Sequence, residues 1–145
     1  VAYDAPAPFA PVLTLAGALL TPTRLYVKSL LKAIRETHAV KGLAHITGGG
    51  ITENLPRVFP SGVRAQVQRS AWSVPPIFQA IARLGQVERE EMYRVFNMGI
   101  GLILVVPAAN AHAIIARAAS LGDPACQIGT IVSSNDEGPS VEYVD

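Results

Sequence analysis

The longest apolar segment of the chain constrains its fold most. Residues 98–106 carry no charged side chain and are rich in Ile and Val. The run is too short to cross a bilayer, which takes about 20 apolar residues, and Pro107 follows it. Uninterrupted β-branched runs are typical of strands covered on both faces. The segment therefore predicts a central strand, against which the rest of the chain packs.

Helices and further strands are predicted around it. In residues 26–37, Val27, Leu30, Leu31 and Ile34 follow the i, i+3, i+4, i+7 spacing of one helix face. Residues 63–69 instead alternate apolar and polar, which indicates a half-buried strand. Other expected helices cover 13–20 (one turn), 52–56, 75–85, 88–95 and 111–121, and other expected strands cover 43–46, 127–132 and 141–144. This mixture predicts an α+β fold with a mixed sheet covered by helices.

The composition describes a folded domain. Half of the 145 residues are hydrophobic and only 16% are charged, which excludes a disordered chain. Twelve basic and eleven acidic residues leave a net charge of +1, so neither nucleic acid nor an anionic membrane is expected as a partner. The single cysteine, Cys126, excludes an internal disulfide. The three histidines lack metal-ligand spacing, so no metal site is predicted in this chain.

The first twelve residues differ from the rest. Pro6, Pro8 and Pro11 disfavour both a helix and a central strand. We therefore expect residues 1–12 to be an extended interdomain linker and residues 13–145 to be the domain. The start at Val1 also suggests a piece of a longer protein.

A glycine-rich loop carries the strongest chemical signal. The sequence Ala-His-Ile-Thr-Gly-Gly-Gly occupies positions 44–50, between the expected strand 43–46 and the helix expected at Thr52. Consecutive glycines let a ligand approach the backbone, and a run of free N–H groups at a helix start binds anions. The loop is not a P-loop, because no Gly-Lys-Ser/Thr follows, and it lacks the spaced glycines of a dinucleotide fingerprint.

Each of these residues also has a purely structural interpretation. The glycines can form a flexible surface turn. His45 can be an ordinary core residue, or it can contact phosphate or act as a general acid or base. Arg57 can clamp an anion or lie exposed at a helix end, and Asn54 can cap the helix or bind ligand. Gly99 and Gly101 indicate either close packing or a second place where a ligand approaches the backbone.

Four motifs in order resemble the phosphoribosylformylglycinamidine cyclo-ligase (aminoimidazole ribonucleotide synthetase) family. They are Thr-Pro-Thr-Arg-Leu-Tyr-Val-Lys at 21–28, Gly-Leu-Ala-His-Ile-Thr-Gly-Gly-Gly at 42–50, Glu-Asn-Leu-Pro-Arg-Val-Phe-Pro at 53–60 and Glu-Met-Tyr-Arg-Val-Phe-Asn-Met-Gly-Ile-Gly at 91–101. The resemblance covers essentially the whole chain, but only the carboxy-terminal half of the family's protein. It implies a three-layer α/β/α domain, partly ferredoxin-like, whose glycine loop lines the cleft between two domains.

The resemblance also implies an activity. The family closes the ring of formylglycinamidine ribonucleotide to give aminoimidazole ribonucleotide in purine biosynthesis. ATP with Mg²⁺ phosphorylates the formamide oxygen, and the neighbouring nitrogen then expels phosphate, leaving ADP. An amino-terminal domain, absent from this sequence, would supply most of the ATP site and the homodimer contact. This chain alone is expected to be inactive, and the enzyme to be cytoplasmic.

On this chain, the resemblance makes His45 the candidate catalytic residue. Thr47, Gly48, Gly49 and Gly50 would form the phosphate nest, with Asn54 and Arg57 behind it. Phosphoryl transfer needs positioning and charge stabilisation rather than a protein nucleophile, in keeping with the lack of a visible triad. Two alternatives remain: a related ATP-using enzyme of the hydrogenase maturation, selenophosphate synthetase or thiamine-phosphate kinase type, and a non-enzymatic anion-binding module.

Overall fold

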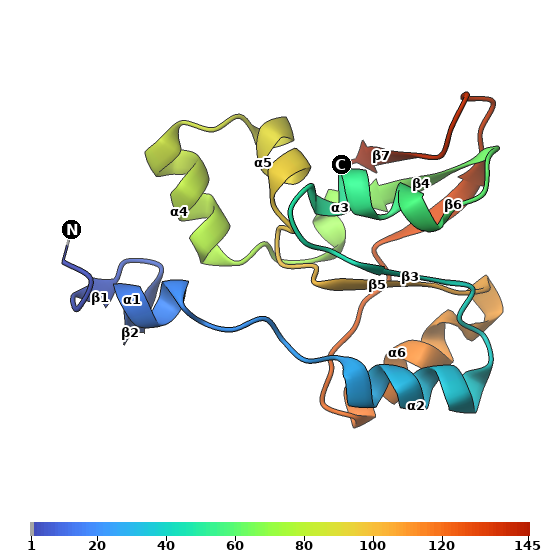
Figure 1. Cartoon of the computed structure of the whole chain (residues 1–145), viewed down its shortest axis with the longest axis horizontal. Helices are drawn as coiled ribbons and strands as arrows, with labels where there is room; N and C mark the ends of the chain where they lie inside the picture. The colour runs from blue at the N-terminus through green and yellow to red at the C-terminus, as the bar shows by residue number, and fades with distance from the viewer. Residues whose placement is uncertain (1) are drawn as a thin grey trace.

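The computed structural model describes residues 2–145 and shows helices on both sides of short sheets, with an arm at the amino-terminal end (Figure 1). The strands are β1 (Pro6–Ala7), β2 (Ala10–Thr14), β3 (Gly42–His45), β4 (Val63–Gln68), β5 (Leu102–Val105), β6 (Gly129–Ser133) and β7 (Ser140–Val144). The α-helices are α1 (Leu15–Leu19), α2 (Val27–Thr37), α3 (Gly50–Asn54), α4 (Pro76–Gly85), α5 (Arg89–Val95) and α6 (Ala111–Ser120). Single 3₁₀ turns are η1 (Pro56–Val58), η2 (Arg69–Ala71) and η3 (Ala108–Asn110). The α+β class predicted from the sequence is confirmed.

The strands of the body form two sheets rather than one. β3 and β5 pair antiparallel, from Gly42 opposite Val105 to His45 opposite Leu102. The second sheet has the order β6-β4-β7 and is mixed, because β4 runs antiparallel to β6 and parallel to β7. The predicted mixed sheet is therefore present, but the prediction that the 98–106 segment is a central strand is wrong: β5 is paired to β3, and β4 is the central strand of the mixed sheet.

One apolar cluster joins the two sheets to α3. Ala44 of β3 and Ile103 of β5 pack with Ala65 and Val67 of β4, together with Ile46, Ile51 and Leu55 from the loop and α3 region. All seven are buried. The sheets thus share a core through their faces, and this core holds the glycine loop between them.

The strand predicted over residues 98–106 begins only at Leu102, because a turn from Asn97 to Ile100 occupies its first residues. Met98 and Gly99 both have positive φ, at 50° and 98°. The Asn97 side chain accepts a hydrogen bond from the Gly99 N–H at 2.9 Å, and the Trp72 indole donates to the Met98 carbonyl at 3.0 Å. A hydrogen-bonded turn with left-handed residues cannot continue a β ladder.

Helix α2 matches its predicted span but buries a narrower face. Ala33 is buried, and Leu30 and Ile34 are half-buried where α2 packs against α6. Val27 and Leu31, expected on the same apolar face, are 61% and 41% exposed. The apolar stripe of the sequence is therefore wider than the surface that α6 covers.

The arm, residues 2–20, extends away from the body in Figure 1. Within the expected linker, Pro6–Ala7 pairs with Ala10–Thr14 as a two-stranded sheet. The Thr14 hydroxyl caps α1 by accepting from the Gly17 N–H at 3.1 Å, where a helical turn was expected. Residues 21–26 then cross to α2 without regular structure. Val1 lies outside the described residues.

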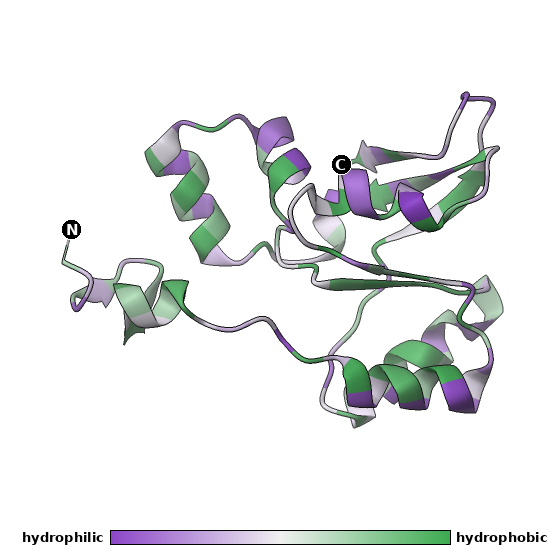
Figure 2. Ribbon diagram, in the orientation of Figure 1, coloured by the Kyte–Doolittle hydropathy of each residue, from purple (hydrophilic) through white to green (hydrophobic). Residues whose placement is uncertain are grey.

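Much of the exposed apolar surface is on the arm and the segment that follows it. Figure 2 shows hydrophobic residues on this part of the chain, outside the core. Its exposed large side chains are Tyr3, Val12, Leu13, Leu19, Leu20 and Leu25. No helix within residues 2–145 has the length and apolar character needed to span a membrane.

Candidate functional site

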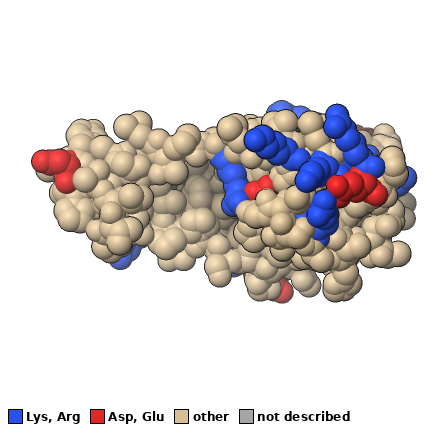
Figure 3. Space-filling view, turned by 90° about the horizontal axis from the view of Figure 1, so that it is seen from below, with Lys and Arg blue, Asp and Glu red and all other residues tan. Residues whose placement is uncertain are grey.

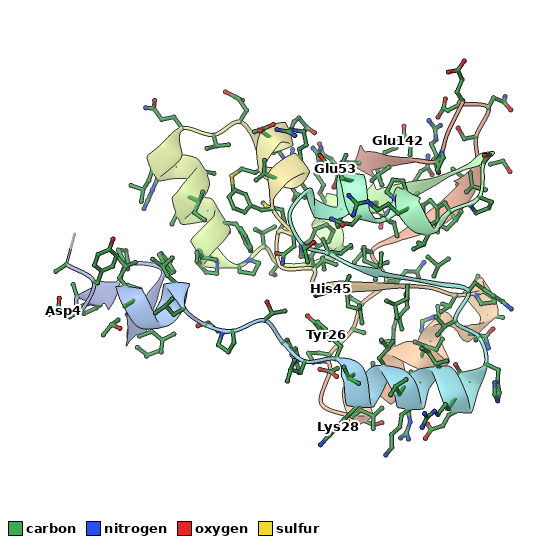
Figure 4. All side chains as sticks on the ribbon, in the orientation of Figure 1. Asp4, Tyr26, Lys28, His45, Glu53 and Glu142 are labelled. Carbon is green, nitrogen blue, oxygen red and sulfur yellow. The ribbon has the colours of Figure 1, made fainter. Side chains whose placement is uncertain are left out.

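The glycine loop leads from the end of β3 into α3. His45 is the last residue of β3 and lies exposed, between buried Ala44 and buried Ile46. Thr47 and Gly48 are also exposed. Alternation along the chain therefore presents His45 and Thr47 to solvent on one side, as the ligand interpretation requires. Figure 4 shows His45 at the end of the β3–β5 pair, on the side of Tyr26 and α2.

Helix α3 begins at Gly50, two residues earlier than the sequence suggests, because the last two glycines adopt left-handed conformations. Gly49 has φ 92° and Gly50 has φ 57°. The Gly49 N–H donates to the Val95 carbonyl at 3.3 Å, and the Gly50 N–H donates to the Thr47 carbonyl at 3.1 Å. Two of the three glycine amides are thus bonded within the protein. In the predicted nest of Thr47, Gly48, Gly49 and Gly50, Gly48 is therefore the glycine whose N–H has no acceptor among the described residues.

Gly50 is required by packing. It is buried, and a Cβ built on it would lie 2.4 Å from the Tyr93 carbonyl oxygen and 2.7 Å from that of Phe96. No side chain fits there unless α5 moves. Gly48 differs, because a Cβ there meets nothing within 4 Å. The glycine run therefore serves two purposes: close approach of the loop to α5 at Gly50, and open space at Gly48.

Asn54 holds the loop from inside. The side chain is only 6% exposed, and its amide donates to the carbonyls of Gly48 at 3.1 Å and Gly50 at 2.8 Å. Its oxygen accepts from the guanidinium of exposed Arg57 at 3.2 Å. Both polar ends of Asn54 are engaged, so its contribution is to fix the shape of the loop. Arg57 lies beside it with further N–H donors to spare.

Glu53 was not singled out by the sequence. Its carboxylate covers Gly49, where a Cβ would meet the Glu53 Oε2 at 2.5 Å. Arg94 lies 3.7 Å from this carboxylate and also binds Glu91 at 2.7 and 2.5 Å, a contact that lowers the pKa of Glu91. An anion at the loop would therefore approach at Gly48 rather than at Gly49, where it would face the carboxylate. In the sequence, the i, i+4 spacing of Gly49 and Glu53 is the only sign of this contact.

A second unpredicted network ties α3 to the carboxy-terminal strand. The Arg69 guanidinium lies 4.9 Å from the ring centres of both Tyr93 and Tyr143, and it pairs with Glu90 at 2.6 Å. The Tyr143 hydroxyl lies 3.1 Å from that of Thr52 on α3. Burial raises the pKa of Tyr143 above its ordinary value of 10.0. These residues fix α3, and with it the loop, against β7 and α5.

A cavity of about 620 Å³ lies elsewhere, between β5, α6 and the segment leading into β6. Its lining is largely aliphatic, and the ion pair of Arg24 with Asp123 at 2.6 Å closes part of its rim. Gly99 and Gly101 border it, but a Cβ on either would collide, with the Pro75 ring or with the Tyr26 hydroxyl. Close packing therefore explains these two glycines. No loop residue from His45 to Gly50 lines the cavity.

No group of three or more His, Cys, Asp or Glu side chains converges anywhere in residues 2–145 as a set of metal ligands. Cys126 is a free thiol at the surface. Within the described chain, the chemical groups at the loop are therefore backbone N–H groups, the Thr47 hydroxyl, an imidazole, a guanidinium and the Glu53 carboxylate.

Comparison with known proteins shows which family this domain matches. Residues 10–142 match the family model described as "AIR synthase related protein, C-terminal domain". The chain belongs to this family. Two solved structures of E. coli HypE share the fold of the AIR synthase related domain seen here. One, described as a hydrogenase maturation protein, has a TM-score of 0.61 and 24% identity, over 81% of this chain and 35% of its own. The other has a TM-score of 0.63 and 22% identity, over 92% and 41%. The chain thus spans well under half the length of each HypE chain.

Proposed function

We propose that this AIR synthase related domain serves an ATP-dependent cyclo-ligase, which converts formylglycinamidine ribonucleotide to aminoimidazole ribonucleotide with release of ADP and phosphate. The observation that carries the proposal is the loop between β3 and α3. It offers His45, Thr47 and the Gly48 N–H to solvent, side by side in sequence, on a rigid frame. The motif at 42–50 is also one of the four in which the chain resembles the cyclo-ligase family.

In this proposal the loop positions phosphate-bearing groups. The Gly48 N–H and the Thr47 hydroxyl supply neutral donors, and His45 supplies a donor or a proton at the end of β3. Fixed donors stabilise charge that develops on a transferring phosphoryl group without reorganising during the reaction. Arg57 adds a cation on the exposed side of Asn54. The chain's own side chains do not make a carboxylate site for the Mg²⁺ of ATP within the described residues.

The arm supports a further part of the proposal, which concerns partners. Large apolar side chains left in water favour burial against another surface. We assign the apolar surface of residues 3–25 to contact with the amino-terminal domain that the family places before this one, in an enzyme that is a cytoplasmic homodimer. Adenine contacts and the metal ligands then belong to that other domain.

A second candidate function is the hydrogenase maturation type. The structural likeness to HypE favours it. The two candidates use one fold and differ in substrate, so a substrate assay separates them.

The test is the reaction itself, with the protein expressed from its intact reading frame. The protein is given ATP, Mg²⁺ and formylglycinamidine ribonucleotide, and the products aminoimidazole ribonucleotide and ADP are separated by chromatography. The proposal predicts equal amounts of both products. ADP release that does not depend on this substrate, without the aminoimidazole product, would overturn the cyclo-ligase in favour of another ATP-using activity.

The role of the loop is tested in the same assay with two glycine variants. Gly48→Ala adds a methyl group where a ligand phosphate would bind, and Gly138→Ala is its matched control. Neither Cβ meets an atom within 4 Å, and neither glycine has positive φ. Turnover should fall at least tenfold in Gly48→Ala and stay within twofold in Gly138→Ala. Equal rates in the two variants would remove the loop from the site.

A further inference from the structure

The basic side chains of the chain are segregated, which its net charge of +1 conceals. All three lysines, Lys28, Lys32 and Lys41, fall within fourteen residues, together with Arg35. Glu36 is the single acidic residue in that stretch. Its carboxylate is bound by Arg117 of α6 at 2.7 and 2.8 Å, which lowers the pKa of Glu36. The segment therefore carries an excess of positive charge that its own acidic residue does not neutralise.

These charges lie on the outer face of α2. Lys28, Lys32 and Arg35 are exposed, and they share an arc of the helix with Val27 and Leu31. We call these five residues the basic face. In Figure 3, which views the molecule from below, Lys and Arg side chains gather over this part of the surface, and Figure 4 shows Lys28 directed away from the body. The face combines three cationic and two aliphatic side chains.

The acidic residue nearest this face is Glu36, whose carboxylate is bound by Arg117 and also feels the charge of Lys32. Within residues 2–145, none of Lys28, Lys32 and Arg35 forms an ion pair. Six of the arginines elsewhere, by contrast, are paired with carboxylates. They are Arg24, Arg64, Arg69, Arg89, Arg94 and Arg117. The inner side of the same helix is already covered by α6, so its outer side is free for a partner.

We propose that the basic face is a docking surface for an acidic segment of a partner protein that also carries aliphatic side chains. Carboxylates spaced along a partner helix or strand would pair with the three cations, and its aliphatic residues would cover Val27 and Leu31. Charge complementarity of this kind steers association and fixes register. The inference concerns a separate surface from the glycine loop and does not depend on the reaction assigned to it.

Two other polyanions fit the face less well. Single-stranded nucleic acids are held by aromatic stacking as well as charge, and the five residues of the face include no aromatic side chain. Helices that lie on membranes present a broad apolar side, often with Trp or Phe. On α2, Leu30, Ala33 and Ile34 of that side are packed against α6, and only Val27 and Leu31 are left exposed. A protein segment with carboxylates and aliphatic side chains can contact both the cations and the aliphatic residues of the face.

The test uses the full 145-residue chain and a synthetic 20-residue helical peptide of Glu, Ala and Leu, with the Lys-for-Glu peptide as its control. Binding is followed by fluorescence anisotropy of the peptide and by the ¹⁵N amide shifts of the protein. Lys28→Glu with Lys32→Glu is compared with the double variant Arg83→Glu with Arg89→Glu, which changes the net charge equally on another surface and also breaks the ion pair of Arg89 with Asp145. Thermal unfolding of each variant shows that it is folded. Anionic vesicles of phosphatidylserine and phosphatidylcholine and a 20-nucleotide single-stranded RNA are titrated in parallel.

The acidic peptide should bind, with shifts on α2, and its affinity should fall at least tenfold in the lysine variant and less than twofold in the arginine variant. Binding should also weaken from 50 to 300 mM salt, since the charges are at the surface. Leu31→Ser should weaken it in addition. The proposal is overturned if the acidic peptide does not bind, if the two double variants bind it equally, or if RNA or vesicles bind the face more tightly than the peptide.

Discussion

Gly50→Ala is the substitution for which the structure predicts the largest effect in the loop. The new Cβ would lie 2.4 Å from the Tyr93 carbonyl oxygen and 2.7 Å from that of Phe96, so α3 or α5 must move. Overpacking of this kind costs about 1–3 kcal/mol. The φ of 57° adds the cost of a left-handed residue with a side chain, roughly 1–2 kcal/mol. Alanine also restricts the unfolded chain more than glycine does, which offsets about 0.4–1 kcal/mol of this loss.

The net expectation is a loss of about 1–5 kcal/mol in the free energy of unfolding. For a chain of this size, that corresponds to a Tm lower by roughly 2–18 °C. Urea unfolding followed by Trp72 fluorescence measures the loss, with Gly48→Ala as control, because its Cβ contacts nothing. Gly48→Ala should remain within about 1 kcal/mol of the parent protein. If Gly50→Ala were as stable as Gly48→Ala, the packing of the loop on α5 would be refuted.

Three further predictions concern residues that hold the glycine loop and its neighbours α3 and α5 in place. Asn54→Ala removes the donors to the Gly48 and Gly50 carbonyls. The free energy of unfolding, measured in urea, should therefore fall by about 1–3 kcal/mol. Unchanged stability would show that Asn54 does not hold the loop. Burial raises the pKa of Tyr143 above 10.0, so the unfolded chain loses this proton at a lower pH than the folded chain does. The contribution of Tyr143 to the free energy of unfolding is therefore fully present below about pH 10 and declines as the pH rises toward the folded pKa. Tyr143→Phe should flatten that alkaline decline in a pH series of thermal melts, and an identical decline would exclude Tyr143 as its source. Arg94→Gln should return the pKa of Glu91 to its ordinary 4.5, as read from the side-chain carboxyl ¹³C shift during a pH titration, and an unchanged titration would contradict the ion pair.

The sequence predicts well what depends on neighbouring residues. The spacing of Leu30 and Ile34 predicts α2, and the alternation from Val63 to Gln68 predicts β4, because each pattern reports which side of a local element faces the core. The change from strand to glycine loop at Thr47 also follows from local chemistry. Such signals come from propensity and periodicity, which need no knowledge of distant partners.

Partners far along the chain could not be predicted in this way. The apolar run at 98–106 indicates a buried strand, yet it contains no information that β5 pairs with β3 and that Met98 turns to meet Trp72. The loop gives the clearest case. Three glycines look equivalent in sequence, but α5, about 45 residues away, makes Gly50 a packing requirement and accepts the N–H of Gly49.

This distinction changes which glycine tests function. Gly49 is the central glycine of the run and the obvious choice, but an alanine there would be strained at φ 92° and would strike Glu53. A loss of activity in Gly49→Ala could therefore come from a distorted loop or from weaker binding, and the assay would not distinguish the two. Gly48 is the position that separates the two.

The proposed function depends above all on phosphate binding by the exposed part of the loop. The direct measurement is a ¹⁵N–¹H titration of the chain with inorganic phosphate and then with ADP. We predict that the amide signals of Thr47 and Gly48 shift with saturation, that those of Gly49 and Gly50 shift less because their N–H groups are bonded internally, and that Gly48→Ala weakens the response. Phosphate and ADP that leave the Thr47 and Gly48 signals in place, while shifting amides elsewhere or none, would contradict the account.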